Sequence, residues 1–230
     1  MSRVLLVEDD PAVREGARLA LRRQGHEVAP ARTGEEGLAQ LRSFLPDVVV
    51  LDLMLPGMTG LEVCRRIRAD SQLPIIIMTA LGDDVDVVLG LETGADDYVV
   101  KPVQARVLDA RIRAVLRRVE AAPSPGGRGA VETYGELSID RAALTVSRGG
   151  VPILLAPSEL RLLLTLSAAP DRVFSRQQLL EAVWEHSYHG DARLVDACVK
   201  RLRTKMGEPP RKPRHIQTVR GFGYRFHSPR

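Results

Sequence analysis

Polar side chains follow four short apolar runs in the N-terminal half, at the point where each run ends. Three are acids, Glu8, Asp9 and Asp52, and the others are a hydroxyl and an amine, Thr79 and Lys101. A carboxylate cluster without histidine suits Mg²⁺ or Mn²⁺ rather than zinc. An aspartate can also accept a phosphoryl group covalently. These residue types therefore indicate phosphoryl transfer onto an aspartate, assisted by Mg²⁺ or Mn²⁺.

Asp52 has the most unusual surroundings of the five. It ends the apolar run 48–51, and a buried lone carboxylate there would be costly unless its charge were compensated. A divalent cation would neutralise the acids, and Lys101 and Thr79 would hold the phosphoryl oxygens, because phosphoryl transfer depends on positioning and charge stabilisation. Each residue alone is weak evidence, since an aspartate at a strand end is more often a cap or turn residue. Together, and in this order, they favour the chemical interpretation.

The elements that would position these residues alternate between strands and helices. Short β-branched runs predict strands at residues 3–7, 26–28, 47–51, 74–78 and 97–100. Patterns with the helical period predict helices at residues 12–24, 34–44, 60–69, 84–93 and 104–118. This alternation indicates an α/β fold, a doubly wound five-stranded parallel sheet covered on both faces. Ligands of such sheets bind beyond the carboxyl ends of the strands, where the polar residues converge.

The chain has 230 residues and a formal net charge of +4, which is unevenly distributed. Residues 1–120 contain 16 basic and 19 acidic residues, whereas residues 121–230 contain 17 basic and 10 acidic ones. This asymmetry suggests a C-terminal part that binds nucleic acid, although a solubilising basic tail would have the same composition. No apolar run approaches the roughly 20 residues of a membrane span, and no secretory leader is evident. A cytoplasmic protein is expected.

A change in composition divides the chain near residue 120. The stretch AAPSPGGRGA has neither helical nor strand period and is typical of a linker. We predict a first domain at residues 1–120, a flexible linker at 121–131 and a second domain at 132–230. In the second domain, short strands precede three helices, and residues 216–226 predict a β-hairpin. This order matches an α+β winged helix-turn-helix.

The helix predicted over residues 192–206 has two unlike faces. One face is apolar and contains Val195, Val199, Leu202 and Met206. The opposite face contains Arg193, Ala197, Lys200, Arg201 and Thr204. It suits the major groove of DNA, where arginine reads guanine and alanine touches a thymine methyl group. A solvated basic face is the alternative, but the preceding helix and the hairpin, whose tip carries Arg220 for the minor groove, argue against it.

Several motifs resemble those of one family. VLLVEDD, LDLMLPGMTG, PIIIMTA and GADDYVVKP resemble the receiver domain of bacterial response regulators, which has the CheY-like (flavodoxin-like) fold. RLVDACVKRLRTK and TVRGFGYRF resemble the recognition helix and wing of the OmpR/PhoB family of two-component transcription factors. The pattern is most similar to actinomycete members, such as those that govern antibiotic production. The resemblance implies a DNA-binding regulator, not an enzyme, phosphorylated by a sensor histidine kinase.

The resemblance also implies roles for residues of the first domain. Asp52 would be the phosphoacceptor, Thr79 and Lys101 would contact the phosphoryl group, and Tyr98 would turn inward on activation. The implied Mg²⁺ ligands are Asp9, Asp52, the carbonyl of Met54 and, through water, Glu8. The resemblance also implies that the phosphorylated protein is a homodimer, joined through the last helix–strand–helix face of the domain.

That dimer face would use ion pairs between subunits. The positions match Glu92 with Arg113 and Asp97 with Arg111. At a further pair, where relatives have charges, this sequence has Val87 and Val107, so we predict an apolar contact there.

For the second domain the resemblance implies a set of DNA contacts. Arg201 is expected to contact a base. The expected phosphate contacts are Arg193, Lys200, Arg203 and Thr218. The dimer would bind a direct-repeat operator in double-stranded DNA, and the loop at residues 185–192 would face RNA polymerase.

Two other functions are disfavoured by particular residues of the sequence. A Mg²⁺-dependent phosphatase with Asp52 as its nucleophile would need a second acid two residues later, where the chain has Met54. A regulator that binds DNA without phosphorylation is disfavoured by the intact acids, Thr79 and Lys101. Because Met54 cannot activate water, we also predict slow loss of phosphate from Asp52.

Overall fold

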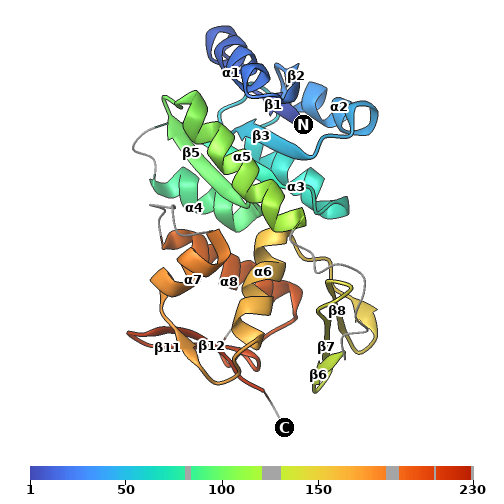
Figure 1. The fold of residues 1–230 in the computed structure, drawn as a ribbon, viewed down its shortest axis with the longest axis vertical. Coiled ribbons are helices and arrows are strands. Elements are labelled where there is room, and N and C mark those ends of the chain that lie inside the picture. Colours follow the sequence, from blue (N-terminus) through green and yellow to red (C-terminus); the bar gives the residue numbers. More distant parts are fainter. Residues whose placement is uncertain (81–83, 121–130, 185–191, 210, 229–230) are drawn as a thin grey trace. The chain divides into compact units, whose positions relative to one another are not determined.

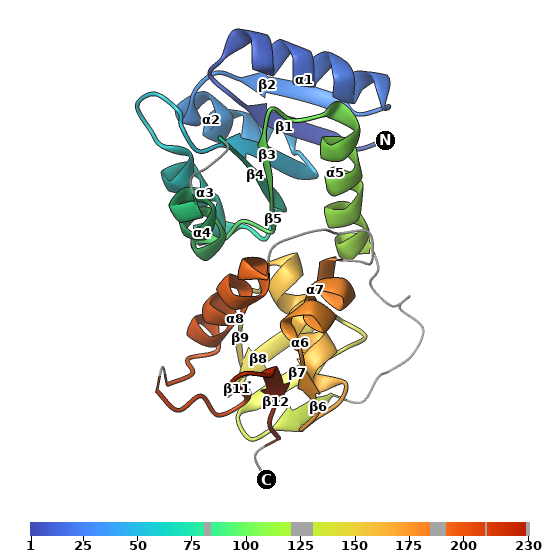
Figure 2. The same ribbon diagram turned by 90° about the vertical axis from the view of Figure 1, so that its left-hand side faces the viewer.

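A computed structural model describes residues 1–80, 84–120, 131–184, 192–209 and 211–228; for residues 80, 84–87 and 118–120 it describes the backbone only. The chain forms two compact units, Met1–Leu116 and Arg117–Arg230, which are described separately (Figures 1 and 2). The predicted linker, apart from Val131, lies outside the described residues. Every helix in the described parts is too short or too polar to cross a lipid bilayer.

The first unit contains the predicted parallel sheet. Its strands are β1 (Arg3–Val7), β2 (Glu27–Ala31), β3 (Val48–Asp52), β4 (Ile75–Ala80) and β5 (Asp97–Lys101). They are ordered β2-β1-β3-β4-β5, and each neighbouring pair is parallel. The order reverses between β1 and β3, so the carboxyl ends of these two strands border the switch point of a doubly wound fold. The predicted fold class is thereby confirmed.

Four helices connect the strands, and a fifth follows β5: α1 (Pro11–Arg23), α2 (Gly34–Phe44), α3 (Gly60–Asp70), α4 (Asp84–Thr93) and α5 (Ala105–Glu120). Short polar side chains begin three of them. Asp10 accepts hydrogen bonds from the backbone N–H groups of the first turn of α1, and the hydroxyls of Thr33 and Thr59 do the same for α2 and α3. Such caps satisfy N–H groups that have no partner within the helix.

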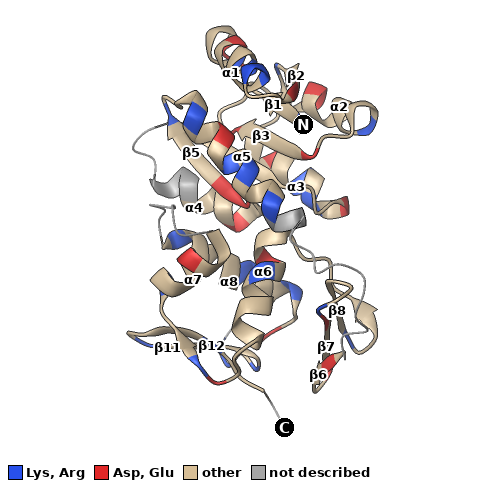
Figure 3. Cartoon of the chain, viewed as in Figure 1, with Lys and Arg blue, Asp and Glu red and all other residues tan. Residues whose placement is uncertain are grey.

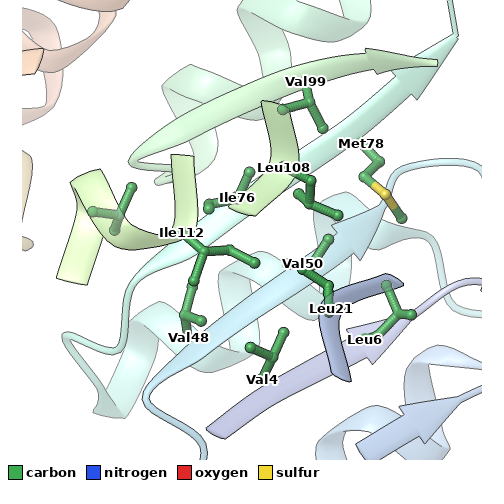
Figure 4. Packing of buried hydrophobic residues seen from close by; sticks show 11 residues of the cluster. Val4, Leu6, Leu21, Val48, Val50, Ile76, Met78, Val99, Leu108 and Ile112 are labelled. Atoms are coloured by element: carbon green, nitrogen blue, oxygen red, sulfur yellow. The ribbon is translucent and has the colours of Figure 1, made fainter. Parts of the chain in front are cut away.

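The strands bury both of their faces, as the apolar runs predicted. On one face, Leu21 of α1 and Leu108, Ile112 and Val115 of α5 pack against alternate strand residues, among them Val50 (Figure 4). The helices α2, α3 and α4 cover the other face, where Gly37 and Gly90 approach strand side chains so closely that a Cβ atom would collide with them. Figure 2 shows the sheet between these helical layers. The resulting core holds the strand ends rigidly.

Two consecutive acids at the start of β5 bind opposite layers. Asp96 is buried and pairs with Arg68 of α3, with 2.7 Å between Arg68 Nη2 and Asp96 Oδ2. Asp97 is also buried and pairs with Arg111 of α5, with 3.0 Å between Arg111 Nη1 and Asp97 Oδ1. The alternation of side chains along the chain places each carboxylate on its own side of the sheet.

The second unit begins with a four-stranded antiparallel sheet and ends with a three-stranded one. The first contains β6 (Glu132–Tyr134), β7 (Leu137–Asp140), β8 (Thr145–Arg148) and β9 (Val151–Pro152). The second contains β10 (Val173–Phe174), β11 (Ile216–Val219) and β12 (Gly223–Phe226), in the order β10-β12-β11. The helices are α6 (Pro157–Ser167), α7 (Arg176–Trp184) and α8 (Arg193–Lys205). This is the predicted winged helix-turn-helix, although sequence reasoning missed β6 and β10.

The wing is the hairpin of β11 and β12. Phe222 N–H donates to Val219 O at 3.0 Å, and Gly221 has φ = 80°, so the turn places a left-handed residue where glycine is favoured. Gly223 is required for a different reason, since a Cβ atom there would lie 2.0 Å from Phe174 O on β10. The sequence RGFGYRF therefore encodes both the turn and its attachment to the sheet.

Candidate phosphoryl-acceptor site and DNA-binding face

The carboxyl ends of β1 and β3 bring three acids into one crevice. Carboxylate oxygens of Glu8, Asp9 and Asp52 all lie within 4.8 Å of one another. Glu8 is fully buried, Asp52 is 3% exposed, and Asp9 is open to solvent. Sequence reasoning predicted that these acids converge, and the sheet topology places them together.

Lys101, at the end of β5, closes the crevice on its other side. Its Nζ lies 2.7 Å from Asp52 Oδ2 and 2.7 Å from Glu8 Oε2. The other Asp52 oxygen, Oδ1, accepts a hydrogen bond from Met54 N–H at 3.1 Å. The charge of the buried carboxylates is thus compensated by an ammonium group from a strand distant in sequence.

The acid–base properties of the crevice follow from these contacts. Burial raises the pKa of Glu8 and Asp52 raises it further, although Lys101 opposes both effects. Burial lowers the pKa of Lys101, but its hydrogen bonds to Asp52 and Glu8 outweigh that effect and raise the pKa above its usual value. Lys101 therefore stays positively charged at neutral pH.

The residues of the crevice fit a hard divalent cation. The donor set consists of carboxylate oxygens, which are the ligands that Mg²⁺ prefers, and no histidine or cysteine belongs to it. Because Asp9 is exposed, solvent can reach the cluster and complete the coordination with water. The geometry supports the expected Mg²⁺ or Mn²⁺ at Glu8, Asp9 and Asp52, with the backbone of Met54 adjoining it.

Arg14 secures the acidic loop, and sequence reasoning missed it. A single guanidinium nitrogen, Nη1, donates to the carbonyl of Glu8 at 2.8 Å and to the carbonyl of Asp9 at 2.8 Å. The side chain thereby fixes the backbone that presents both acids. The only signal in the sequence is an arginine one helical turn after the cap Asp10.

The two residues expected to respond to phosphorylation, Thr79 and Tyr98, lie on neighbouring strands. Thr79 on β4 is 2% exposed, and its partner across the sheet is Val100 of β5. Tyr98, two residues earlier on β5, is half-buried. The structure therefore places Thr79 at the buried end of β4, with Tyr98 on the adjacent edge strand.

The residues expected at a dimer interface lie on α4, β5 and α5. Figure 3 shows acidic and basic residues interleaved along β5 and α5. Val107 is 43% exposed, while the side chain of Val87 lies outside the described residues. The half-buried Glu92 lies near the end of α4.

The arginines expected to pair between subunits have partners within the chain. Arg111 binds the buried Asp97, as described above, and Arg113 binds Asp109 on its own helix, with 3.0 Å between Arg113 Nε and Asp109 Oδ1. Any ion pairs across a dimer would therefore have to share or exchange these contacts.

Comparison with known proteins agrees with this architecture. Residues 4–113 match the family described as response regulator receiver domain, and residues 150–226 match the transcriptional regulatory protein, C-terminal, family. The chain is 59% identical over 229 residues to the transcriptional regulatory protein AfsQ1 of Streptomyces coelicolor, covering 100% of both chains. It belongs to the OmpR/PhoB family of response regulators. It is thus a transcriptional regulator and not an enzyme, and the expected likeness to actinomycete regulators is confirmed.

Other members of the family are similar along their whole length. The transcriptional regulatory protein CseB of Streptomyces avermitilis is 50% identical over 232 residues, with 97% of each chain covered. Among solved structures, a cysteine-to-serine mutant of RitR matches with a TM-score of 0.81 and 28% identity, covering 99% of this chain and 100% of that one. DrrB of Thermotoga maritima, an OmpR/PhoB homologue, matches with a TM-score of 0.51 and 36% identity, covering 99% of each chain.

In this OmpR/PhoB regulator, α8 is the helix expected to recognise DNA, and its buried side is larger than predicted. Val195, Val199, Leu202 and Met206 are buried as expected. Two members of the predicted DNA-contacting face are buried as well: Ala197 is 5% exposed and Arg201 is 9% exposed. The burial of both side chains disfavours the base contact predicted for Arg201 and the thymine contact predicted for Ala197, and both stay predictions.

Arg201 is buried because it compensates an internal acid. Glu159 of α6 is fully buried, and it accepts from Arg201 Nε at 2.8 Å and from Lys205 Nζ at 2.7 Å. Burial raises the pKa of Glu159, but the charges of Arg201 and Lys205 outweigh it and hold that pKa below its usual value. Glu159 also accepts from Ala156 N–H at 2.9 Å, at the start of α6. Arg201 thus anchors the recognition helix.

Arg203 joins the recognition helix to the wing. Its guanidinium donates to Ile216 O at 2.8 and 3.0 Å, and to Thr218 Oγ1 at 2.8 Å. It also lies over the ring of Tyr224. Both Arg203 and Thr218, expected at phosphates, therefore have roles within the protein, although Thr218 remains exposed.

A residue missed by sequence reasoning, Asp196, links α7, α8 and the wing. Asp196 Oδ1 accepts from Arg176 Nε at 2.7 Å and from the Tyr224 hydroxyl at 2.7 Å. Burial, together with the bond to Asp196, raises the pKa of Tyr224 to about 12, so its hydroxyl remains a donor. The side of α8 that is open to solvent is therefore turned from the buried Arg201 toward Asp196. It includes Lys200 and the half-buried Arg193. Arg220 is exposed at the tip of the wing.

Proposed function

We propose that this response regulator is phosphorylated on Asp52 by a sensor histidine kinase, and that it then dimerises and binds double-stranded DNA. The observation that carries the proposal is the position of Lys101 Nζ, 2.7 Å from both Asp52 and Glu8 at the carboxyl edge of the sheet. An ammonium group bound to the acceptor carboxylate is suitably placed to stabilise the oxygens of an incoming phosphoryl group. The protein would act in the cytoplasm.

In the proposed reaction an Asp52 oxygen attacks phosphorus, the O–P bond forms, and the P–N bond to the kinase histidine breaks. Lys101 moves with its charge onto a phosphoryl oxygen, and the Thr79 hydroxyl donates to another. A bound Mg²⁺ supplies charge neutralisation among the acids. Glu8, Asp9 and Asp52 would hold it with the carbonyl of Met54, and Arg14 keeps the acidic loop in place. Tyr98 would then turn inward as the phosphorylated site rearranges.

The homodimer is proposed to use the surface of α4, β5 and α5. Val107 is an exposed apolar residue of α5 and would meet Val87 of the partner subunit's equivalent surface. The expected ion pairs between subunits, Asp97 with Arg111 and Glu92 with Arg113, would form by sharing or exchanging the contacts that both arginines make within the chain. Dimerisation would present two recognition helices to a direct-repeat operator, with an avidity that separate domains lack.

The DNA contacts proposed here take account of the buried residues. Lys200 and Arg193 of α8, with Thr218 and Arg220 of the wing, would contact DNA, while Arg203 holds α8 against the wing. Phosphate contacts of this kind fix the register of a protein on the duplex. The contact with RNA polymerase is assigned to the loop at residues 185–192, of which 185–191 lie outside the described residues.

Incubation of the full-length protein with Mg²⁺ and acetyl phosphate, followed by intact mass measurement, tests the phosphorylation. One phosphate adduct is expected on the wild type and none on Asp52→Asn. An adduct that survives this substitution, or no adduct on the wild type, would contradict the assignment of Asp52. Binding of the phosphorylated protein to a random-sequence duplex library, followed by sequencing of the bound DNA, tests the proposed DNA binding. We expect a directly repeated motif to be enriched.

A further inference from the structure

The described residues between α8 and β11 include three exposed cations, and we call residues 207–209 and 211–215 the basic loop. Arg211, Lys212 and Arg214 are exposed. Their side chains have no hydrogen-bond or ion-pair partner among the residues that the structure describes, which omit position 210. None of these three charges belongs to the recognition helix, the wing or the phosphoryl-acceptor site.

A buried carboxylate closes the basic loop. Glu208 is 8% exposed, and it accepts hydrogen bonds from the backbone N–H groups of Arg214 and His215, the latter at 3.2 Å. His215 Nδ1 lies 2.6 Å from Glu208 Oε1. One side chain thus binds the two ends of the loop together, and the acid that could neutralise its cations points inward.

Further contacts attach the basic loop to the body of the domain. Arg148 on β8 donates to the carbonyls of Met206 at 2.8 Å and Gly207 at 3.1 Å, at the end of the recognition helix. At the other end, His215 Nε2 lies 3.0 Å from Tyr134 O on β6. These contacts fix the backbone at both ends of the loop, so binding a ligand there would require little further ordering of the chain.

The position of the basic loop is as informative as its charge. It follows α8 directly and leads into β11, so it adjoins both elements proposed to contact DNA. Residues 193–230, which include the loop, contain 11 basic and only 2 acidic residues. The two acids are Asp196 and Glu208, and both bind groups of the protein itself.

We propose that the basic loop is a second phosphate-binding surface, which contacts the DNA backbone next to the segment that α8 occupies. The inference rests on the DNA binding proposed above and extends it beyond the recognition helix and wing. The loop carries no exposed large apolar residue and no outward acid, so its chemistry is complementary to a polyanion rather than to a protein surface. Contacts with phosphates add affinity without adding sequence preference.

The salt dependence of DNA binding measures this contribution. Each phosphate contact adds about 0.9 to the negative slope of log K against log salt concentration. With one phosphate contact for each residue, the double variant Arg211→Gln/Lys212→Gln should therefore reduce the magnitude of the slope by about 1.8 for each bound subunit, or about 3.6 for a bound dimer. The motif selected from a random duplex library should stay the same, and hydroxyl-radical footprints should lose protection at backbone positions that flank the motif.

A matched control separates local contact from net charge. Arg22→Gln/Arg23→Gln removes two exposed charges from α1 of the receiver and should leave the slope unchanged. A slope that is unaltered in the loop variant, or that falls equally in both variants, overturns the role of the loop alone. If the loop variant keeps the salt dependence of DNA binding but loses its binding to RNA polymerase or its self-association, the loop binds a protein partner and the proposal is overturned. If the wild type binds no duplex at any salt concentration, the proposed DNA binding fails together with the inference.

Discussion

Lys101 and Asp52 are 49 residues apart in sequence, yet Lys101 Nζ donates to Asp52 Oδ2 across 2.7 Å. The same ammonium binds Glu8 at an equal distance. One cation therefore links the acceptor carboxylate to a residue of the expected metal site. A phosphoryl group or a metal ion that enters the crevice must compete with this contact or share it.

Replacing Lys101 with glutamine should slow phosphorylation of Asp52. The variant keeps a hydrogen-bond donor but removes the charge that would stabilise the phosphoryl oxygens, and we expect a rate loss of about 100-fold with acetyl phosphate. Time-resolved intact mass measures this rate. Arg23→Gln on α1 is the control, and equal rates for both variants would refute a direct role for Lys101.

Met54 should determine how long the phosphate persists. Its side chain is 69% exposed beside Asp52 and contains no group that accepts a proton from water. Met54→Glu introduces such a group, so we expect the phosphate half-life to shorten at least about tenfold, with a smaller effect for Met54→Asn. Phosphate release after removal of the donor is the measurement. Unchanged half-lives in both variants would show that water is activated by another route.

Val107→Asp should weaken dimerisation of the phosphorylated protein. A charge placed on an apolar contact lacks a partner, and a loss of about tenfold or more in dimer affinity is expected. Sedimentation velocity of the phosphorylated chain gives the affinity. Leu19→Asp is a close control because Leu19 on α1 is also 43% exposed and lies outside the proposed interface. Equal dimer affinities for wild type and Val107→Asp would exclude this surface.

Substitutions of Arg201 and of its neighbour Lys200 should affect different properties, the first the stability of the second unit and the second the binding of DNA. Arg201→Met leaves Glu159 with Lys205 alone, so the free energy of unfolding of the second unit should fall by about 3 kcal/mol, the low end for breaking a buried pair. Lys200→Met should leave that stability unchanged and weaken DNA binding. Trp184, the single tryptophan, is buried in α7, so its fluorescence during urea unfolding reports this unit. If Arg201→Met keeps the stability of the second unit and weakens DNA binding, the prediction that Arg201 contacts a base would be supported.

The second unit should lose stability in acid. Burial raises the pKa of Glu208, but its bonds from His215 and from backbone N–H groups outweigh it, so the folded pKa lies below the usual value. The folded state therefore binds fewer protons than the unfolded chain, and this stabilisation is complete above about pH 5 and decreases as the pH falls below about 4.3. Urea midpoints from Trp184 fluorescence measure the effect. In Glu208→Gln the urea midpoint should fall less steeply with decreasing pH than in the wild type. An identical pH dependence in the two proteins would contradict the role of Glu208.

The receiver site could be predicted because it depends on strand ends. A run such as VVVLD fixes where β3 ends, and the parallel topology then brings Asp52, Glu8 and Lys101 together without any knowledge of side-chain packing. Arg14 escaped prediction because its partners are backbone carbonyls, which have no signature in the sequence.

The recognition helix was predicted less accurately, for a physical reason. Its period placed Arg201 on the basic face opposite the apolar residues, but a long arginine side chain can turn from that face toward a buried acid. The deciding contact is with Glu159, 42 residues earlier in the chain, whose burial no local pattern indicates. Burial of a charge depends on its tertiary partner, so a helical period alone cannot assign it.

The consecutive acids Asp96 and Asp97 fix the register of β5 in the sheet. Their side chains reach Arg68 on one side of the sheet and Arg111 on the other. A slip of one residue exchanges the faces of a strand, so both carboxylates would be buried away from their arginines at once. Misaligned pairing of this edge strand would therefore incur two energetic penalties together, so the dipeptide disfavours any shifted register of β5.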